Sequence, residues 1–266
     1  MRSGTYYENV VLNKQLILKG IGMPVVNGSK NVDFTDYYID KVAFTIEADG
    51  CLIDSFKIVG IRIRRDPFPF MMEHYRKLSG IGIVSDYNIV KNNTILELDD
   101  GIFLTSSSNT IINNTVLKTE LGIHMDISSK NKIIGNNLSK NNCGIYLYGP
   151  CKNNIFTNNT ISNNKVGVQW LYYCTHNTFD RNIVLSDGYD VRLLECSDNI
   201  LSNNIIQRNI SLVRSHNNTL LNNTILEPNT ILVQRFLFII SINIWHHPTR
   251  NFIHFVFPFE NHGHLI

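Results

Sequence analysis

Asparagine and aliphatic residues recur along the chain at intervals of about 22 residues. Each unit reads Asn, any residue, an aliphatic residue or Phe, any two residues, Asn, any residue, and another aliphatic residue. Both Asn columns are filled in seven successive units, the first by Asn88, Asn109, Asn131, Asn154, Asn177, Asn199 and Asn218, and the second by Asn93, Asn114, Asn136, Asn159, Asn182, Asn204 and Asn223. A fixed period that is filled so regularly is typical of a solenoid of stacked repeats.

Each unit contains about three short β-strands. A Gly followed by an aliphatic residue opens one of them, at Gly101, Gly122, Gly144 and Gly167. Apolar residues then alternate with polar ones, which marks a strand with one buried face. About 22 residues at about 3.3 Å each trace one turn of a three-sided coil, and successive coils pair as parallel strands about 4.8 Å apart. The sequence therefore predicts an all-β protein folded as a right-handed parallel β-helix.

The Asn columns have a physical explanation. Asn tolerates the left-handed backbone conformation that a sharp bend requires. When Asn residues stack in register, each side-chain amide donates a hydrogen bond to a carbonyl of the next coil. We expect these residues to be structural and to supply both the bends and a ladder of hydrogen bonds.

The repeat divides the chain into four segments. Residues 1–60 form irregular N-terminal coils, in which Cys51 and Phe56 take the places of the two Asn residues. Residues 61–79 form an inserted loop, because Ile58 and Gly80 are 22 positions apart where the regular units have six. Residues 80–227 hold the regular repeats. Residues 228–266 are a tail without repeats, which we expect to be a partial C-terminal cap or disordered.

Composition and charge exclude two classes of function. Charged residues make up 17% of the chain, the net charge is +2, and no stripe of Lys and Arg runs over the repeats, so we expect no nucleic-acid partner. No apolar run reaches the length of about 18 residues that a membrane span requires. Met1-Arg2-Ser3 leads into the repeats without an apolar stretch, so we expect no signal peptide in this chain.

Several motifs resemble NosD-type β-helix domains. They are the opening from Gly4-Thr5-Tyr6-Tyr7 to Leu16-Ile17-Leu18-Lys19-Gly20, and the units Asn92-Asn93-Thr94-Ile95 and Gly144-Ile145-Tyr146-Leu147. The resemblance covers about residues 4–227 and implies a pectin-lyase-like solenoid. It also implies an extracellular, cell-surface or periplasm-like location, as in surface proteins of methanogenic archaea, with copper or a carbohydrate as the ligand.

Copper is the first ligand that the resemblance raises. A column of small residues stands three positions before each first Asn, at Ser85, Ser106, Ser128, Cys151, Cys174, Cys196 and Ser215. Three Cys residues on adjacent coils offer soft ligands for Cu(I), or they fill a tight inward corner as small buried side chains. No metal-ligand spacing of His or Cys occurs within the coils. We predict reduced, buried thiols, no metal site and no cofactor, with copper implied by the resemblance alone.

Polysaccharide cleavage is an alternative. Hydrolysis uses two carboxylates about 5 to 9 Å apart, and the candidates are Asp99, Asp100, Asp126, Asp187 and Asp190. Asp126 follows His124, and Arg192 follows Asp190, each by two positions, so each pair could share the outer side of one strand. No cluster of acid, base and Arg on adjacent coils stands out, and we therefore name no catalytic residue.

Binding of a sugar without catalysis is the interpretation that we favour. Aromatic residues gather on two successive units, at Tyr146, Tyr148, Trp170, Tyr172 and Tyr173. Trp170 and Tyr172 share the parity of Val168 and are expected inside the coil. We predict that the ligand-binding residues are Tyr146, Tyr148, Gln169, Tyr173 and Arg192. The main hypothesis is a non-catalytic NosD-like β-helix that presents a rigid face to a polysaccharide or a surface protein. A lyase, hydrolase or epimerase and a copper-binding accessory protein are the alternatives.

Overall fold

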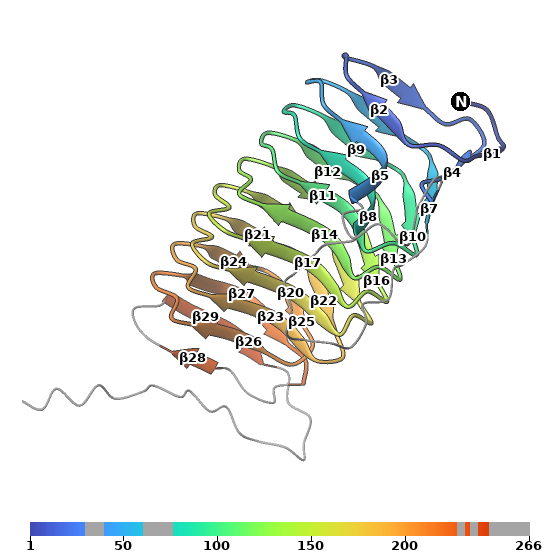
Figure 1. Ribbon diagram of the computed structural model, residues 1–266. Helices are drawn as coiled ribbons and strands as arrows, with labels where there is room; N and C mark the ends of the chain where they lie inside the picture. The colour runs from blue at the N-terminus through green and yellow to red at the C-terminus, as the bar shows by residue number, and fades with distance from the viewer. Residues whose placement is uncertain (30–39, 61–76, 228–231, 235–238, 245–266) are drawn as a thin grey trace, which may run out of the picture.

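Stacks of parallel β-strands wind around one axis in the computed structural model (Figure 1). The structure describes residues 1–29, 40–60, 77–227, 232–234 and 239–244, and within these ranges it contains strands and no helix. Neighbouring strands come from successive coils and pair in parallel register. The predicted all-β parallel β-helix is confirmed. In the described ranges, no helix is present that could cross a membrane.

The first stack is a ten-stranded sheet. Its strands are β2 (Val10–Leu12), β5 (Asp40–Ile46), β8 (Lys77–Ile83), β11 (Asp100–Leu104), β14 (Leu121–Asp126), β17 (Cys143–Tyr148), β20 (Val166–Leu171), β23 (Tyr189–Leu194), β26 (Ile210–Val213) and β28 (Leu232–Gln234).

The other two sides of each coil carry shorter strands. The second stack consists of β3 (Ile17–Lys19), β6 (Leu52–Asp54), β9 (Ile89–Lys91), β12 (Thr110–Ile112), β15 (Lys132–Ile134), β18 (Ile155–Thr157), β21 (Thr178–Asp180) and β24 (Ile200–Ser202). The third stack consists of β1 (Thr5–Tyr6), β4 (Val25–Asn27), β7 (Lys57–Val59), β10 (Thr94–Leu96), β13 (Thr115–Leu117), β16 (Asn137–Ser139), β19 (Thr160–Ser162), β22 (Ile183–Leu185) and β25 (Ile205–Ile206). Both stacks end on the longer strands β27 (Thr219–Ile225) and β29 (Ile239–Ile244).

The Asn columns form the predicted ladders at two corners of the coil. The backbone N–H of Asn136 donates to Oδ1 of Asn159 at 2.9 Å, and the side-chain amide of Asn136 donates to the same oxygen at 3.1 Å. The amide of Asn159 in turn donates to the carbonyl of Ile133, in the preceding coil, at 2.9 Å. Each Asn therefore joins its own coil to both neighbours, and the side chains are fully buried.

The bends themselves are made by other residues than we expected. The ladder Asn residues are absent from the positive-φ positions of the described chain, and the residue immediately before each one has the left-handed conformation, as at Asn92, Asn113 and Asn158. The expectation that the ladder Asn residues supply the bend was therefore wrong. The preceding residue turns the chain, which leaves the next side chain pointing inward to reach the neighbouring coil.

A third, shorter ladder stands at the corner before the first stack. The backbone N–H of Thr119 donates to Oδ1 of Asn141 at 2.9 Å, and that of Asn141 donates to Asn164 at 2.8 Å. The following coil has Ser186 at this place, and its N–H donates instead to Oδ1 of Asp190 at 2.9 Å. Asp190 lies in the same coil as Ser186 and accepts hydrogen bonds from the N–H groups of Arg208 and Asn209 in the next, so a carboxylate links these coils where the Asn column ends.

Spacings between ladder partners show where the coils are longer. Within the regular repeats the partners are 21 to 23 residues apart, and at the last coil 19. The N–H of Cys51 donates to Oδ1 of Asn88 over 37 residues, so this coil contains extra chain. Residues 61–76 of the predicted inserted loop lie outside the described residues, and 77–79 begin β8. In the tail, β28 and β29 pair with β26 and β27.

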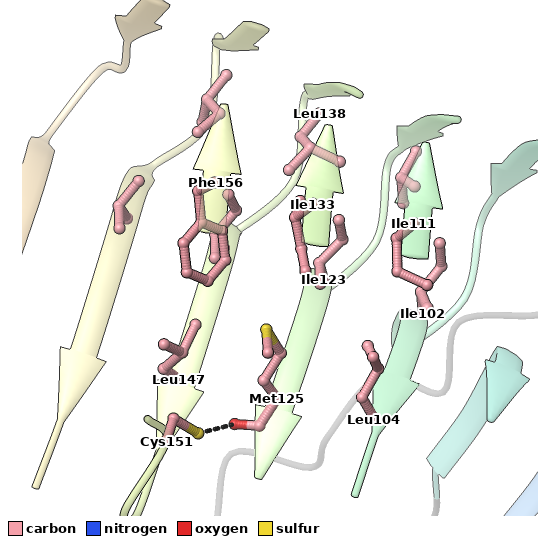
Figure 2. Close-up of a cluster of buried hydrophobic side chains, with 14 of the residues drawn as sticks. Ile102, Leu104, Ile111, Ile123, Met125, Ile133, Leu138, Leu147, Cys151 and Phe156 are labelled. Atoms are coloured by element: carbon pink, nitrogen blue, oxygen red, sulfur yellow. Dashed lines mark hydrogen bonds between the residues drawn. The ribbon is translucent and has the colours of Figure 1, made fainter. Parts of the chain in front are cut away.

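The core is a set of apolar files that run along the axis, one side chain per coil. Figure 2 shows Ile102, Ile123 and Leu147 among the side chains that fill the interior. Aromatic rings fill the interior at two levels: the ring centroids of Phe44 and Phe56 lie 5.2 Å apart in the early coils, and in the later coils Phe156 lies 5.4 Å from Trp170 and 6.2 Å from Phe179. Each file is buried only when its neighbours are present, so stability accumulates over coil interfaces.

We predict that Asn159→Leu lowers the free energy of unfolding by about 1 to 3 kcal/mol, because the N–H of Asn136 and the carbonyl of Ile133 lose their partner. Chemical denaturation measures the change. Asn137→Leu is the control, because Asn137 is an exposed Asn in a strand of the third stack and lies outside the ladders. Equal unfolding midpoints for the two variants would contradict the ladder.

Candidate functional site

The outer side of the first stack carries a file of polar and aromatic side chains, one from each of five successive strands. Register places Phe103 beside His124, then Tyr146, Gln169 and Arg192. The residues that flank His124 in its strand, Ile123 and Met125, are fully buried, so this set faces outward. We call Phe103, His124, Tyr146, Gln169 and Arg192 the first-face file.

The rings at the start of the file are in contact. The centroid of His124 lies 4.8 Å from that of Phe103 and 5.2 Å from that of Tyr146. Nδ1 of His124 lies 3.0 Å from Oδ2 of Asp100, one coil earlier, and both side chains are almost fully buried. This hydrogen bond fixes the plane of the imidazole, which is what a positioned acid–base residue requires and what a structural histidine also has.

The structure divides the five predicted ligand-binding residues between two places. Tyr146, Gln169 and Arg192 are half-buried members of the first-face file. The guanidinium of Arg192 lies 5.8 Å from the ring centroid of Tyr189, in a cation–π arrangement. Tyr148 and Tyr173, which are 45% and 65% exposed, lie at the corner that follows the first stack.

Strand alternation predicted that Trp170 and Tyr172 lie inside the coil, and only the prediction for Trp170 is confirmed. Trp170 is fully buried, packs against Phe156 and Phe179, and its Nε1 has no hydrogen-bond partner among the described residues. Tyr172 is exposed, and the prediction that it lies inside was wrong. Strand β20 ends at Leu171, so the alternation no longer applies at Tyr172, which has φ 58° and belongs to the corner.

The candidate aspartates do not form a carboxylate pair. Asp190 is fully buried at the start of β23, whereas Arg192 is half-buried in the first-face file, so the expected pairing of these two on the outer side of the strand was wrong. Burial raises the pKa of the Asp190 carboxyl, although the N–H groups of Ser186, Arg208 and Asn209 donate to it. Asp190 therefore has a structural role, because its carboxylate accepts hydrogen bonds from three backbone N–H groups.

Asp99 and Asp187 lie away from the file as well. Oδ2 of Asp99 accepts a hydrogen bond from the N–H of Leu78 at 3.0 Å, and Asp187 is exposed in the turn before β23. Asp126, two residues after His124, faces outward and is half-buried. Among the described residues, the candidate carboxylates of this face are therefore Asp100, which is hydrogen-bonded to His124, and Asp126, which follows His124 by two residues in β14.

The three thiols of the small-residue column are buried and reduced. Cys151, Cys174 and Cys196 are fully buried and free. The sulfur of Cys174 lies 3.3 Å from the carbonyl oxygen of Gly149, and that of Cys151 lies 3.7 Å from the carbonyl oxygen of Met125 (Figure 2). Hydrogen bonding with Cys151 and Cys196, reinforced by burial, raises the pKa of the Cys174 thiol.

The middle thiol of this column is a poor ligand for copper. A thiol binds metal as a thiolate, and the raised pKa of Cys174 and its contacts with backbone carbonyls favour the protonated form, whereas hydrogen bonding with Cys174 lowers the pKa of the Cys151 thiol. In the part of the chain that the structure describes, no group of three or more His, Cys, Asp or Glu side chains is arranged to hold a metal ion. The five histidines of the tail, His246, His247, His254, His262 and His264, lie outside that part.

The fold defines the class of protein, a pectin-lyase-like parallel β-helix. Two solved structures share this architecture. Tailspike protein 2 of bacteriophage CBA120, in its enzymatically active domain, matches with a TM-score of 0.61 and 11% identity over 91% of this chain and 42% of its own. The GH136 lacto-N-biosidase of Eubacterium ramulus matches with a TM-score of 0.54 and 9% identity over 91% and 61%. This chain thus spans about two fifths to three fifths of their lengths.

The family is more specific than the fold. The sequence profile of the family described as periplasmic copper-binding protein (NosD) matches residues 71–186 and 151–234, which together cover more than half of the chain. The chain belongs to the NosD family. No curated protein sequence matches it.

We predict that Cys143, Cys151, Cys174 and Cys196 react slowly with a thiol-alkylating reagent in the folded protein and rapidly after unfolding. Burial raises the pKa of the Cys143 thiol to about 12, so its native labelling stays slow up to about pH 10, where an exposed thiol is largely ionised. Peptide mass spectrometry after a short alkylation pulse measures each site. Rapid native labelling, or stoichiometric binding of Cu(I) that is lost in Cys174→Ser, would show the thiol assignment to be wrong.

Proposed function

We propose that this chain binds a polysaccharide along the outer side of its first stack and does not cleave it. The observation that carries the proposal is the register of the first-face file, in which successive coils align Phe103, His124, Tyr146, Gln169 and Arg192, all half-buried except His124, which is almost fully buried between its neighbours. Parallel coils repeat about every 4.8 Å, so a chain molecule that lies along the axis meets a new side chain at each coil.

The residue types suit a sugar polymer. Aromatic rings offer apolar faces on which a sugar ring stacks, while the amide of Gln169 and the guanidinium of Arg192 donate hydrogen bonds to hydroxyl or carboxylate groups. The strands that carry these side chains are held on both sides by the ladders. A surface that is ordered before binding loses little conformational entropy when the ligand arrives, which favours affinity.

The comparisons support this proposal at the level of the family and the fold. The family is described as periplasmic, and we propose an extracellular or periplasmic location for this chain. One structural neighbour is described as a lacto-N-biosidase, an enzyme whose name denotes a sugar substrate, and the other as an enzymatically active tailspike domain. The sequence identities are only about a tenth, so these two comparisons support the architecture alone. The proposal of a sugar ligand rests on the first-face file.

Catalysis is the second candidate, and one observation favours it. The Asp100–His124 hydrogen bond at 3.0 Å positions an imidazole within the first-face file, between the rings of Phe103 and Tyr146. Hydrolysis uses two carboxylates, and among the described residues of this face Asp100 is already hydrogen-bonded to His124, which favours binding over cleavage. Incubation of the chain with each bound glycan, followed by a reducing-end assay and an absorbance assay for unsaturated sugars, tests this candidate. Activity that is abolished in His124→Gln would replace the non-catalytic proposal.

We predict that Tyr146→Ala and Gln169→Leu each weaken binding of the best ligand from a glycan array by about 2- to 10-fold, because each removes one contact worth about 0.5 to 1.5 kcal/mol. Isothermal titration calorimetry measures the change. Tyr87→Ala and Asn137→Leu remove an exposed Tyr and an exposed Asn elsewhere on the molecule and are the matched controls.

Three results would count against the proposal. A glycan array without a ligand would exclude it. Equal losses in the test and control variants would move the binding surface away from the first-face file. Tight copper binding by the whole chain, with a metal-to-protein ratio of one, would favour the copper-binding accessory protein instead.

A further inference from the structure

Five residues from three successive coils gather at the corner that follows the first stack. They are Asp126, Ile127, Tyr148, Tyr172 and Tyr173, and we call them the aromatic corner. Ile127 and Tyr173 are each 65% exposed. The rings of Tyr148 and Tyr172 meet edge to face, with centroids 5.6 Å apart and planes at 86°. Large side chains are thus concentrated at a corner whose residues take no part in the Asn ladders.

The backbone of the aromatic corner is strained. Ile127 has φ 44°, Tyr172 has φ 58° and Tyr173 has φ 65°. Left-handed backbone is disfavoured for residues with large or β-branched side chains and is ordinarily supplied by Gly or Asn. Gly149, with φ 71°, supplies it in the coil between them. Glu195 and Arg214 have the same left-handed backbone at this corner of the later coils, so the conformation belongs to the coil, and what distinguishes the aromatic corner is the large exposed side chains placed on it.

One carboxylate oxygen at this corner lacks a hydrogen-bond donor. Oδ1 of Asp126 is buried and has no partner among the described residues. It lies beside Gly149, since a Cβ atom added to Gly149 would be 3.6 Å from this oxygen and 3.1 Å from Cγ1 of Ile127. A buried acceptor without a donor is unfavourable, and a hydroxyl group that approaches over Gly149 would satisfy it.

We propose that the aromatic corner is a binding subsite for one neutral sugar residue of the polysaccharide. The inference rests on the proposed function and names the class of sugar. Tyr148 lies two residues after Tyr146 in the same strand, so the aromatic corner adjoins the first-face file in the direction of the strand. The sugar ring stacks on Tyr148 or Tyr173, and its hydroxyls donate to the carboxylate of Asp126.

Charge selects a neutral residue over a uronic acid at this place. A uronate carboxylate beside Asp126 would meet a like charge, whereas a neutral sugar offers only hydroxyl donors. Lys130 and Lys152 are exposed further round the same corner, on the side of the second stack. Matched neutral and acidic oligosaccharides therefore give the decisive contrast between a subsite centred on Asp126 and one centred on these two lysines.

The experiment titrates the whole chain with two sets of oligosaccharides of equal length. One set is neutral, built from mannose, glucose, galactose or N-acetylglucosamine, and the other consists of oligouronates. The variants are Tyr173→Asn and Asp126→Asn. Tyr87→Asn is the control, because Tyr87 has φ 60° and is 66% exposed at a corner on another coil. Calorimetry gives the affinity, and thermal unfolding gives Tm for each variant.

We expect the wild-type chain to prefer neutral oligosaccharides. Tyr173→Asn and Tyr87→Asn should both raise Tm, because Asn adopts the left-handed conformation at lower cost. Only Tyr173→Asn should also weaken neutral binding, by about 2- to 10-fold. Asp126→Asn should narrow the preference for neutral over uronic ligands. A structural role alone would change Tm and leave that preference unaltered.

The outcomes separate this inference from the proposed function. If no oligosaccharide binds the wild-type chain, the proposed function fails and the subsite fails with it. If oligosaccharides bind, and Tyr146→Ala weakens them while Tyr173→Asn and Asp126→Asn do not, the first-face file stands and the subsite is overturned. A wild-type preference for oligouronates that persists in Asp126→Asn would also overturn it.

Discussion

Each ladder Asn uses its side-chain amide to satisfy two backbone groups of the preceding coil and to reach the next Asn of the ladder. At Asn159, Oδ1 accepts from the N–H of Asn136, while the amide donates to the carbonyl of Ile133 and to Oδ1 of Asn182. A sharp corner would otherwise bury backbone groups that no strand pairing reaches, at a cost of about 1 to 3 kcal/mol for each. The ladders remove this cost at every coil and keep successive coils in register.

Register is what turns a repeated sequence into a surface. Because the corners are held in line, side chains at equivalent positions of successive coils form straight files, both inside and outside the sheet. The inner files are limited to apolar residues by burial, and the corners to Asn by hydrogen bonding. Outer positions are free of both limits. The first-face file and the aromatic corner lie at such positions, and this is why we assign binding to them.

Residues that recur in one column at a fixed spacing could be predicted from the sequence, and contacts between different columns often could not. The Asn columns and the burial of Cys151, Cys174 and Cys196 follow from spacing alone, and the structure agrees with them. The third ladder was missed because its column mixes Thr119, Asn141, Asn164 and Ser186, which share little in sequence. The left-handed residue was placed one position too late, since Asn often occupies both positions.

The candidate site shows the same division. Alternation placed Trp170 correctly and failed at Tyr172, because it cannot tell where a strand ends. The Asp100–His124 hydrogen bond joins residues 24 positions apart on different columns, so no single spacing reveals it. Asp190 looked like a site residue and is a backbone acceptor, which becomes visible only when Ser186, Arg208 and Asn209 are placed around it.

Native-state hydrogen exchange at the corner amides tests most directly whether the ladders hold the solenoid together. The backbone N–H groups of Asn114, Asn136 and Asn159 donate to side-chain oxygens and to no backbone group. If the ladders hold the coils, these amides exchange as slowly as those of the strands on either side, through the same opening of the coils. Fast exchange at the corners, beside protected strands, would show that strand pairing alone holds the fold and that the ladders contribute little.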